Sequence, residues 1–329
     1  MFMKSYALFC GILTCIILSV PAQAVDPIWL PSKPIEIWVA SGKGTYPDVW
    51  AKDIVSIIEQ QRLSPVPFKV VNVPKGNGKE ALPIFGSLKN EDHKLMFVLS
   101  DVLALPLFQP NIANTLNHVT PIARIGSEAL AIWVKSQEST MSTIGQLTRT
   151  ARQKGRAFTM AGPPQGTSRA MLARMFMALH AIDGTYVGIK RIGSTARALA
   201  EKDFDAAIYA PSEQLKLSNP DLVKPVAFFT DKRAKNFSHV PTLSEKGVPL
   251  IYEASRIIIG PPDMKRSVQE YYVKLLQIVC NTPEWQKIRG NGDHLDGFLA
   301  GQDLQNFIVQ VRNKHSRWKM ALEVLMQAN

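Results

Sequence analysis

Apolar residues in this chain recur in two patterns that predict alternating strands and helices. Apolar runs rich in β-branched residues, which are typical of buried strands, occur at residues 35–40, 68–73, 95–99, 131–134, 157–160, 206–209, 226–229 and 257–259. Between many of them apolar residues recur at helical spacing, as at Trp50, Ile54, Ile57 and Ile58. This repetition indicates an α/β fold with parallel sheets and helices on both faces.

The last part of the chain differs, because it has helical periodicity with little strand signal. From Met264 onward one long apolar face is predicted, formed by Leu304, Phe307, Ile308, Val311, Trp318, Leu322 and Leu325. No linker rich in Pro, Gly or Ser separates two halves, so we expect the chain to pass between two domains more than once. We predict domain I at 25–126 plus 254–329 and domain II at 127–253.

The first 24 residues have the three parts of a secretory signal peptide. Lys4 supplies the positive charge, residues 6–20 are almost wholly apolar, and the segment ends in Ala22-Gln23-Ala24. Cleavage is predicted between Ala24 and Val25, so we expect the mature chain to be exported. The alternative is an uncleaved membrane anchor, but the apolar run is shorter than the ~20 residues that a spanning helix needs.

Composition and charge narrow the picture further. The chain has 329 residues, of which 46% are hydrophobic and 20% charged, as in an ordinary globular protein. The formal net charge is +11, but the basic residues are dispersed, and the densest cluster (Lys232, Arg233 and Lys235) lacks interleaved aromatic residues. We therefore expect no nucleic-acid binding. Signal cleavage leaves Cys280 as the one cysteine, which excludes an internal disulfide and fits a small buried apolar residue.

Glycine-containing loops give the strongest functional signal. Four of them, at 41–45, 76–78, 162–168 and 192–195, follow predicted strands or precede predicted helices. The N–H groups at the start of a helix can hold an anion, and such loops would converge on a crevice between the sheets. The alternative for any single loop is a tight turn without a ligand. The predicted ligand-binding residues are Ser41, Lys43, Gly44, Thr45, Asp48, Gly76, Asn77, Gly78, Gly166, Thr167, Ser168, Arg169, Arg191, Gly193 and Ser194.

Motifs for catalysis, metals and nucleotides do not stand out. Neither Gly42-Lys43-Gly44-Thr45 nor the glycines at 76–78 have phosphate-loop spacing, and H-E-x-x-H and G-x-S-x-G motifs are absent. The six histidines are scattered without ligand spacing. We predict no catalytic residues, metal or cofactor, although a catalytic triad assembled only in space leaves no motif in a sequence.

The order of several motifs resembles the Bug-type solute receptors, the extracytoplasmic substrate-binding subunits of tripartite tricarboxylate transporters. The likeness begins at Pro31-Ser32-Lys33-Pro34-Ile35 with Gly44 and Asp48, and continues at residues 71–78, 120–123 and 166–167. Residues 239–247 resemble the family's D-V-P-T-x-x-E-x-G motif, and Trp318 lies where the family's last helix carries a tryptophan. The resemblance spans the chain from about Pro31 to Trp318.

This resemblance implies a type II periplasmic binding protein of two α/β domains with a ligand cleft between them. It implies a receptor that closes on a small organic anion, a carboxylate, and delivers it to the membrane permease subunits of a tripartite transporter. We expect the chain to act as a monomer. Two other classes stay open: a sensory protein that signals to a membrane kinase, and an exported enzyme on a similar scaffold.

Departures from the family pattern concentrate in the predicted site. Thr45 stands where the family has a second glycine, and Ala170 where it has a histidine. Basic side chains near the crevice (Lys43, Lys75, Arg169, Arg191 and Arg256) would favour a ligand with more than one anionic group, unless they point to solvent. Asp48 either touches the ligand or organises the first turn of a helix.

Overall fold

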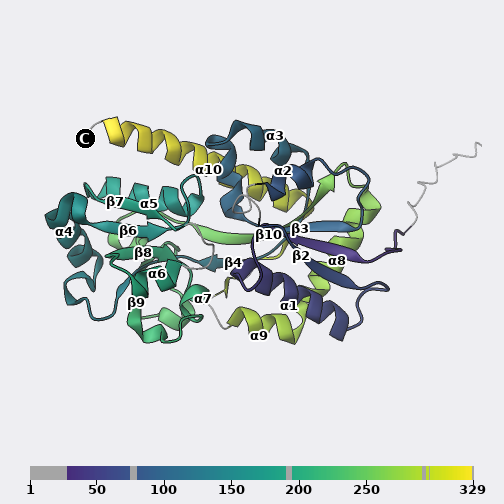
Figure 1. Ribbon diagram of the computed structural model, residues 1–329, viewed down its shortest axis with the longest axis horizontal. Coiled ribbons are helices and arrows are strands. Elements are labelled where there is room, and N and C mark those ends of the chain that lie inside the picture. The colour runs from purple at the N-terminus through teal and green to yellow at the C-terminus, as the bar shows by residue number, and fades with distance from the viewer. Residues whose placement is uncertain (1–27, 75–79, 190–194, 291–293, 296, 328–329) are drawn as a thin grey trace, which may run out of the picture.

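The computed structural model describes residues 28–74, 80–189, 195–290, 294–295 and 297–327. Within these residues the chain forms two β-sheets, one with seven strands and one with five, and helices pack on both (Figure 1). The α/β fold expected from the sequence is confirmed. The predicted signal peptide lies outside the described residues.

The larger sheet contains β1 (Ile35–Val39), β2 (Phe68–Asn72), β3 (Lys94–Leu99), β4 (Val119–Ala129), β10 (Glu253–Pro262), β11 (His294–Leu295) and β12 (Leu299–Ala300). Its strand order is β11-β4-β10-β3-β1-β2, and β12 also pairs with β4. β1 runs parallel to β2 and β3, whereas β10 is antiparallel to β3 and β4.

Helices cover both faces of this sheet because its strands are apolar on both sides. Ile35, Ile37 and Val39 of β1 pack on one face, together with helices α1 (Tyr46–Gln60), α8 (Arg266–Asn281) and α9 (Pro283–Gly290). The other face is covered by α2 (Ala81–Gly86), the 3₁₀ helix η2 (Ser100–Leu107), α3 (Pro110–His118) and the beginning of α10 (Gly301–Gln327).

The smaller sheet contains β5 (Ala131–Lys135), β6 (Thr159–Gly162), β7 (Thr185–Gly188), β8 (Ala206–Tyr209) and β9 (Val223–Phe228). Its order is β7-β6-β8-β5-β9. β6 is parallel to β7 and β8, and β5 is antiparallel to β8 and β9. The expectation of parallel sheets is therefore wrong in part, because both sheets are mixed.

One face of the smaller sheet packs on α4 (Ile144–Lys154) and α5 (Ser168–Leu179), and the other packs on α6 (Thr195–Glu201). The remaining elements are α7 (Pro211–Gln214), η3 (Ser139–Met141), η4 (Gly155–Ala157), η5 (Pro220–Leu222), η6 (Lys235–Phe237) and η7 (Ser244–Lys246).

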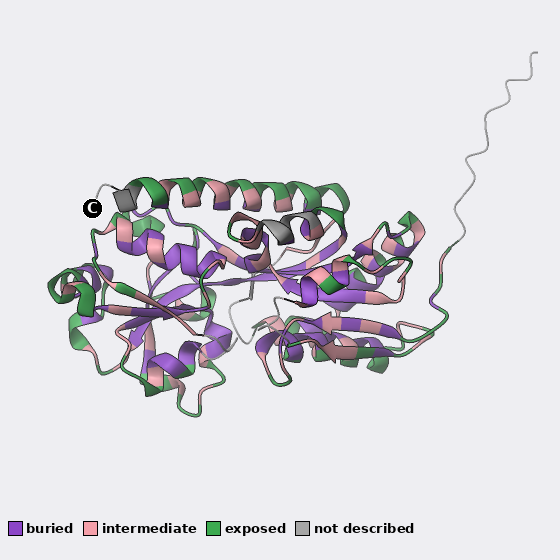
Figure 2. Cartoon of the chain, turned by 45° about the horizontal axis from the view of Figure 1, so that its top comes forward, coloured by how far each residue is buried: buried purple, intermediate pink, exposed green. Residues whose placement is uncertain are grey.

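The chain passes between the two sheets along extended segments, as the sequence predicts. β4 of the larger sheet is followed after Leu130 by β5 of the smaller one, and the chain returns through β10. We call the seven-stranded sheet with its helices the larger unit and the five-stranded sheet with its helices the smaller unit. Helix α10 lies across both units, with exposed residues along its outer side (Figure 2). Leu304 and Val311 join the core of the larger sheet, and Leu322 joins that of the smaller one. The predicted domain boundaries stay a proposal.

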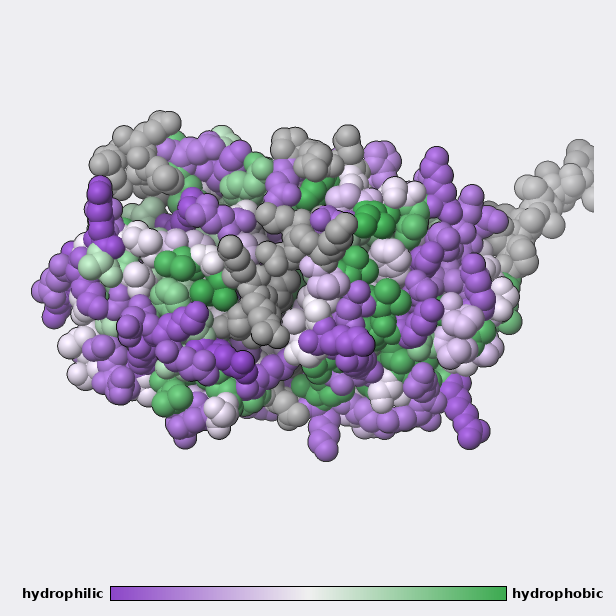
Figure 3. Space-filling view, viewed as in Figure 1, coloured by the Kyte–Doolittle hydropathy of each residue, from purple (hydrophilic) through white to green (hydrophobic). Residues whose placement is uncertain are grey.

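The surface of the protein is mostly hydrophilic on the face that Figure 3 shows, and its free cysteine is buried. On the face seen in Figure 3, hydrophobic side chains form separate patches among hydrophilic ones. Among the described residues, every helix is too short or too polar to span a membrane. Cys280 lies in α8 and is buried against the larger sheet, as predicted, and burial raises the pKa of its thiol to about 12.

Candidate ligand-binding site

A cavity of about 310 Å³ is lined by residues from both units of the fold. The larger unit contributes the end of β1, the start of α1, and an apolar wall from β3 and η2; the smaller unit contributes the loop between β6 and α5. The lining residues are Ala40, Ser41, Pro47, Leu82, Met96, Phe97, Val98, Leu99, Asp101, Val102, Leu105, Pro163, Pro164, Gln165, Thr167 and Arg169.

The first predicted loop is a hydrogen-bonded turn between β1 and α1. The hydroxyl oxygens of Ser41 and Thr45 are 2.6 Å apart, and the Thr45 hydroxyl donates to the Gly42 carbonyl at 2.7 Å. Gly44 has a φ of +75°, which favours glycine, and its N–H donates to Asp48 at 2.7 Å. Among these residues Ser41 reaches the cavity lining, while the others shape the loop behind it.

Asp48 organises this loop. Its side chain is fully buried, and its carboxylate accepts hydrogen bonds from the Asn72 amide at 2.9 Å and the Lys52 ammonium at 2.8 Å, besides the Gly44 N–H. Burial alone would raise the pKa of Asp48, but these hydrogen bonds outweigh it and lower the pKa. Of the two alternatives for this residue, the contacts favour the organising one. Lys43 is exposed and lies outside the cavity lining.

The third predicted loop carries the smaller unit's side of the cavity. Gly166 has a φ of +86° and turns the chain toward α5. The Thr167 hydroxyl caps α5 by accepting from the Ala170 N–H at 3.3 Å, and it donates to the Pro164 carbonyl at 2.9 Å. Ser168 is buried at the first position of the helix. The first turn of α5 thus lies beside the cavity with N–H groups that have no acceptor within the helix.

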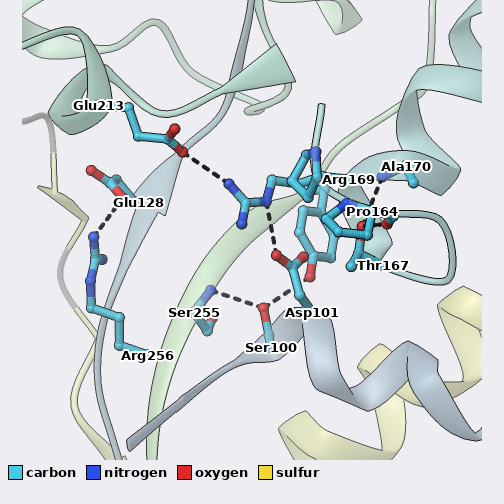
Figure 4. A network of polar contacts seen from close by, with 12 residues as sticks. Ser100, Asp101, Glu128, Pro164, Thr167, Arg169, Ala170, Glu213, Ser255 and Arg256 are labelled. Carbon is cyan, nitrogen blue, oxygen red and sulfur yellow. Dashed lines mark hydrogen bonds and ion pairs between the residues drawn. The ribbon is translucent and has the colours of Figure 1, made fainter. Parts of the chain in front are cut away.

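Arg169 reaches the cavity, but its charge is already paired (Figure 4). Its Nε donates to Asp101 Oδ2 at 2.8 Å, and its Nη1 donates to Glu213 Oε1 at 3.0 Å. Asp101 belongs to η2 of the larger unit and Glu213 to α7 of the smaller one. The expectation that Arg169 adds positive charge to the crevice is wrong, because two carboxylates contact its guanidinium, while its ligand-binding role stays a prediction.

Arg256 is a second predicted cation that the structure pairs elsewhere. It is fully buried on β10, donates to Glu128 at 2.5 Å, and lies 3.7 Å from the centroid of the Trp50 ring. It also donates to the Tyr46 hydroxyl. Arg256 is absent from the cavity lining, and the expectation that it adds positive charge to the crevice is wrong because Glu128 balances it.

Two other predicted loops, at residues 75–79 and 190–194, lie outside the described residues. The ligand-binding roles of these positions stay predictions; they comprise Gly76, Asn77, Gly78, Arg191, Gly193 and Ser194, together with the predicted cation Lys75.

Sequence reasoning missed Asp101 and the apolar wall of the cavity. The wall is formed by residues 96–99 of β3 with Val102 and Leu105 of η2. The sequence prediction relied on glycines, whereas Ser100 and Asp101 are a polar pair directly after a strand that ends at the same sheet edge as β1. The position of this polar pair after a strand is the sequence signal that could have identified Asp101.

Among the described residues, no group of three or more His, Cys, Asp or Glu side chains could hold a metal ion.

The comparisons with known proteins show the fold. No protein-family model and no curated protein matches the sequence significantly. The periplasmic binding protein BugD superposes with a TM-score of 0.77 at 14% identity, covering 90% of this chain and 98% of BugD.

Two Rhodopseudomonas palustris structures carry ligands. MatC with bound malate superposes with a TM-score of 0.73 at 16% identity, covering 89% of this chain and 100% of MatC. Rpa4515 with adipate superposes with a TM-score of 0.79 at 17% identity, covering 89% of this chain and 98% of Rpa4515. The chain therefore has the two-domain α/β fold of the periplasmic binding proteins.

Proposed function

We propose that this chain is an extracytoplasmic solute receptor of the Bug type, which binds a small organic carboxylate between its two units. The observation that carries the proposal is the cavity lined by both units, next to the first turn of α5. The free N–H groups and the positive end of the helix dipole favour an anion there. The neighbours MatC and Rpa4515 hold malate and adipate in the same fold, which supports a carboxylate for this chain.

The proposed mechanism is ligand-stabilised closure. A ligand that contacts Ser41 on one side and Thr167 on the other gains both sets of contacts only when the units are together. Its higher affinity for that arrangement shifts the population toward the closed form. The extended crossings β4–β5 and β10 are the segments in which a change of angle would be absorbed.

The transport role is the second part of the proposal. The mature chain, starting at Val25, would act in the periplasm as a monomer and pass its ligand to the permease subunits of a tripartite tricarboxylate-type transporter. Periplasmic neighbours of the same fold support this location. Cells that lack the chain should lose uptake of the acid that it binds, whereas loss of a signalling response with uptake intact would indicate the sensory alternative.

Binding is tested by thermal unfolding of the mature chain with a panel of mono-, di- and tricarboxylates, each paired with its neutral amide. A ligand that binds only the folded state raises the melting temperature, by an amount that grows with ligand concentration. We expect shifts with carboxylates and none with the matched amides. Equal shifts with acids and amides, or none across the panel, would refute a carboxylate receptor.

A further inference from the structure

Three buried charged side chains meet beside the cavity, and two of them, Asp101 and Arg169, line it. Arg169 of α5 lies between Asp101 of η2 and Glu213 of α7, with nitrogen–oxygen distances of 2.8 and 3.0 Å (Figure 4). All three are nearly inaccessible, with exposed fractions of 8%, 6% and 6%. The cluster joins the two units, since Asp101 belongs to the larger one and the other two belong to the smaller one.

Asp101 is held in place from its own unit. The preceding residue, Ser100, accepts a hydrogen bond from the Ser255 N–H on β10 at 3.0 Å, and its hydroxyl is 2.9 Å from that of Tyr252 (Figure 4). This anchors the start of η2 to the neighbouring strand. The Asp101 carboxylate is therefore presented to the cavity and to Arg169 by the fold itself.

The charges of the cluster sum to zero or less. The carboxylates of Asp101 and Glu213 raise the pKa of Arg169 despite its burial, so the guanidinium stays protonated. Burial raises the pKa of Glu213, which Arg169 opposes. Whether or not Glu213 is ionised, Asp101 balances Arg169, and no net positive charge is left for a ligand at this end.

The remaining lining is apolar or neutral. Among the described residues that line the cavity, Asp101 and Arg169 are the ones with a formal charge. A ligand carboxylate placed against them would lie beside the Asp101 carboxylate, with the Nε and Nη1 donors of Arg169 already occupied and no net positive charge to balance its own, which is unfavourable in a buried place. An alkyl or ring segment, by contrast, fits against the apolar wall that includes Met96, Val102 and Leu105.

We propose that Asp101 is a specificity-determining residue that makes this cavity select a carboxylic acid with one ionised group and an apolar body over a dicarboxylate. The single carboxylate lies at the first turn of α5, and the apolar body extends toward η2. The inference rests on the proposed function, because it assumes that the cavity binds a carboxylate. It departs from the expectation of a ligand with several anionic groups.

The test compares acids of equal length with one or two carboxylates: butyrate with succinate, hexanoate with adipate, and octanoate with suberate. Isothermal titration calorimetry on the mature wild-type chain should give at least tenfold tighter binding for the monocarboxylate in the best-binding pair. Asp101→Asn removes the charge that occupies Arg169 and should shift that ratio at least tenfold toward the dicarboxylate. Asp231→Asn, the same change at an exposed position, should leave the ratio unchanged.

The outcomes separate this inference from the proposed function. Tighter binding of the dicarboxylates by the wild-type chain would overturn the role of Asp101 while leaving the carboxylate receptor intact. An unchanged ratio in a folded Asp101→Asn variant, checked by circular dichroism, would overturn it too. If that variant fails to fold, the wild-type ratio alone decides. No binding of any acid would refute both proposals.

Discussion

At the level of single residues, Asp48 shows how a buried carboxylate can organise the loop between β1 and α1. We expect Asp48→Asn to lower the free energy of unfolding by about 1–3 kcal/mol at neutral pH, because the amide cannot accept from all the donors that surround the carboxylate. Because folding lowers the pKa of Asp48, the stabilisation that its contacts contribute increases with pH. The wild-type advantage is present above the unfolded pKa of about 3.9 and is lost as the pH falls through the lower folded value.

Urea unfolding of the variant between pH 3 and pH 7 measures this effect. Glu59→Gln is the matched control, since Glu59 is an exposed acid on the same helix, and we expect a change within about 0.5 kcal/mol. Equal stabilities of the two variants would show that the Asp48 contacts contribute nothing to the loop.

His315 of α10 is a second residue with a defined pH effect. It is fully buried beside Tyr252 and Trp318, and burial lowers its pKa to about 4 although the Asp101 charge opposes this. The unfolded chain protonates this histidine near pH 6.5, so stability is lost as the pH falls from about 6.5 to about 4, by at most about 3.4 kcal/mol.

Replacing this histidine isolates its contribution. His315→Phe should remove that part of the pH slope of the free energy of unfolding, whereas His239→Phe at an exposed position should keep the wild-type slope. Identical slopes in the two variants would contradict a neutral buried His315.

At the level of elements, the start of α5 is capped by Thr167 and lies beside the cavity. Thr167 and Thr143 both cap helices, by accepting from the N–H groups of Ala170 and Gln146, but only Thr167 lines the cavity. We expect Thr167→Ala and Thr143→Ala each to cost about 0.5–2 kcal/mol of stability. Ligand affinity should fall only in the Thr167 variant. Titration calorimetry on both variants checks this, and equal affinities would exclude the α5 start as the binding point.

The accuracy of the sequence-based predictions also differs between elements for physical reasons. The 206–209 run matches β8 residue for residue, because all four of its side chains are buried and apolar. The polar β7 and the crossing strand β4 were missed, since β4 contains Pro121, Arg124 and Gly126 and has no apolar run. A sequence pattern predicts a strand where consecutive side chains are apolar, and burial alone leaves no such pattern, since most of β4 is buried.

In the candidate site, too, the features with a local sequence pattern were predicted and those that depend on distant residues were missed. The glycine loops around Gly44 and Gly166 were found because a left-handed backbone leaves a mark in the sequence. The pairing of Arg169 with Asp101 and of Arg256 with Glu128 could not be predicted, because the partners are separated by 68 and 128 positions. Whether a cation is free or balanced depends on such tertiary contacts.

At the level of the complete fold, two units are joined by extended crossings and by α10, and both of them line one cavity. The fold is shared with periplasmic binding proteins over about nine-tenths of the chain. In the proposed mechanism, binding and closure are one event, because the ligand would supply contacts that connect the two units.

A crystal structure of the mature chain with the tightest-binding acid would show directly whether the two units hold a carboxylate between them. We predict the ligand inside the cavity between the units, with its carboxylate at about 2.7–3.2 Å from an N–H group in the first turn of α5. We also predict the apolar part of the ligand against β3 and η2. A ligand bound outside this cavity, or with its carboxylate paired to Arg169 in place of Asp101, would contradict this mode of binding.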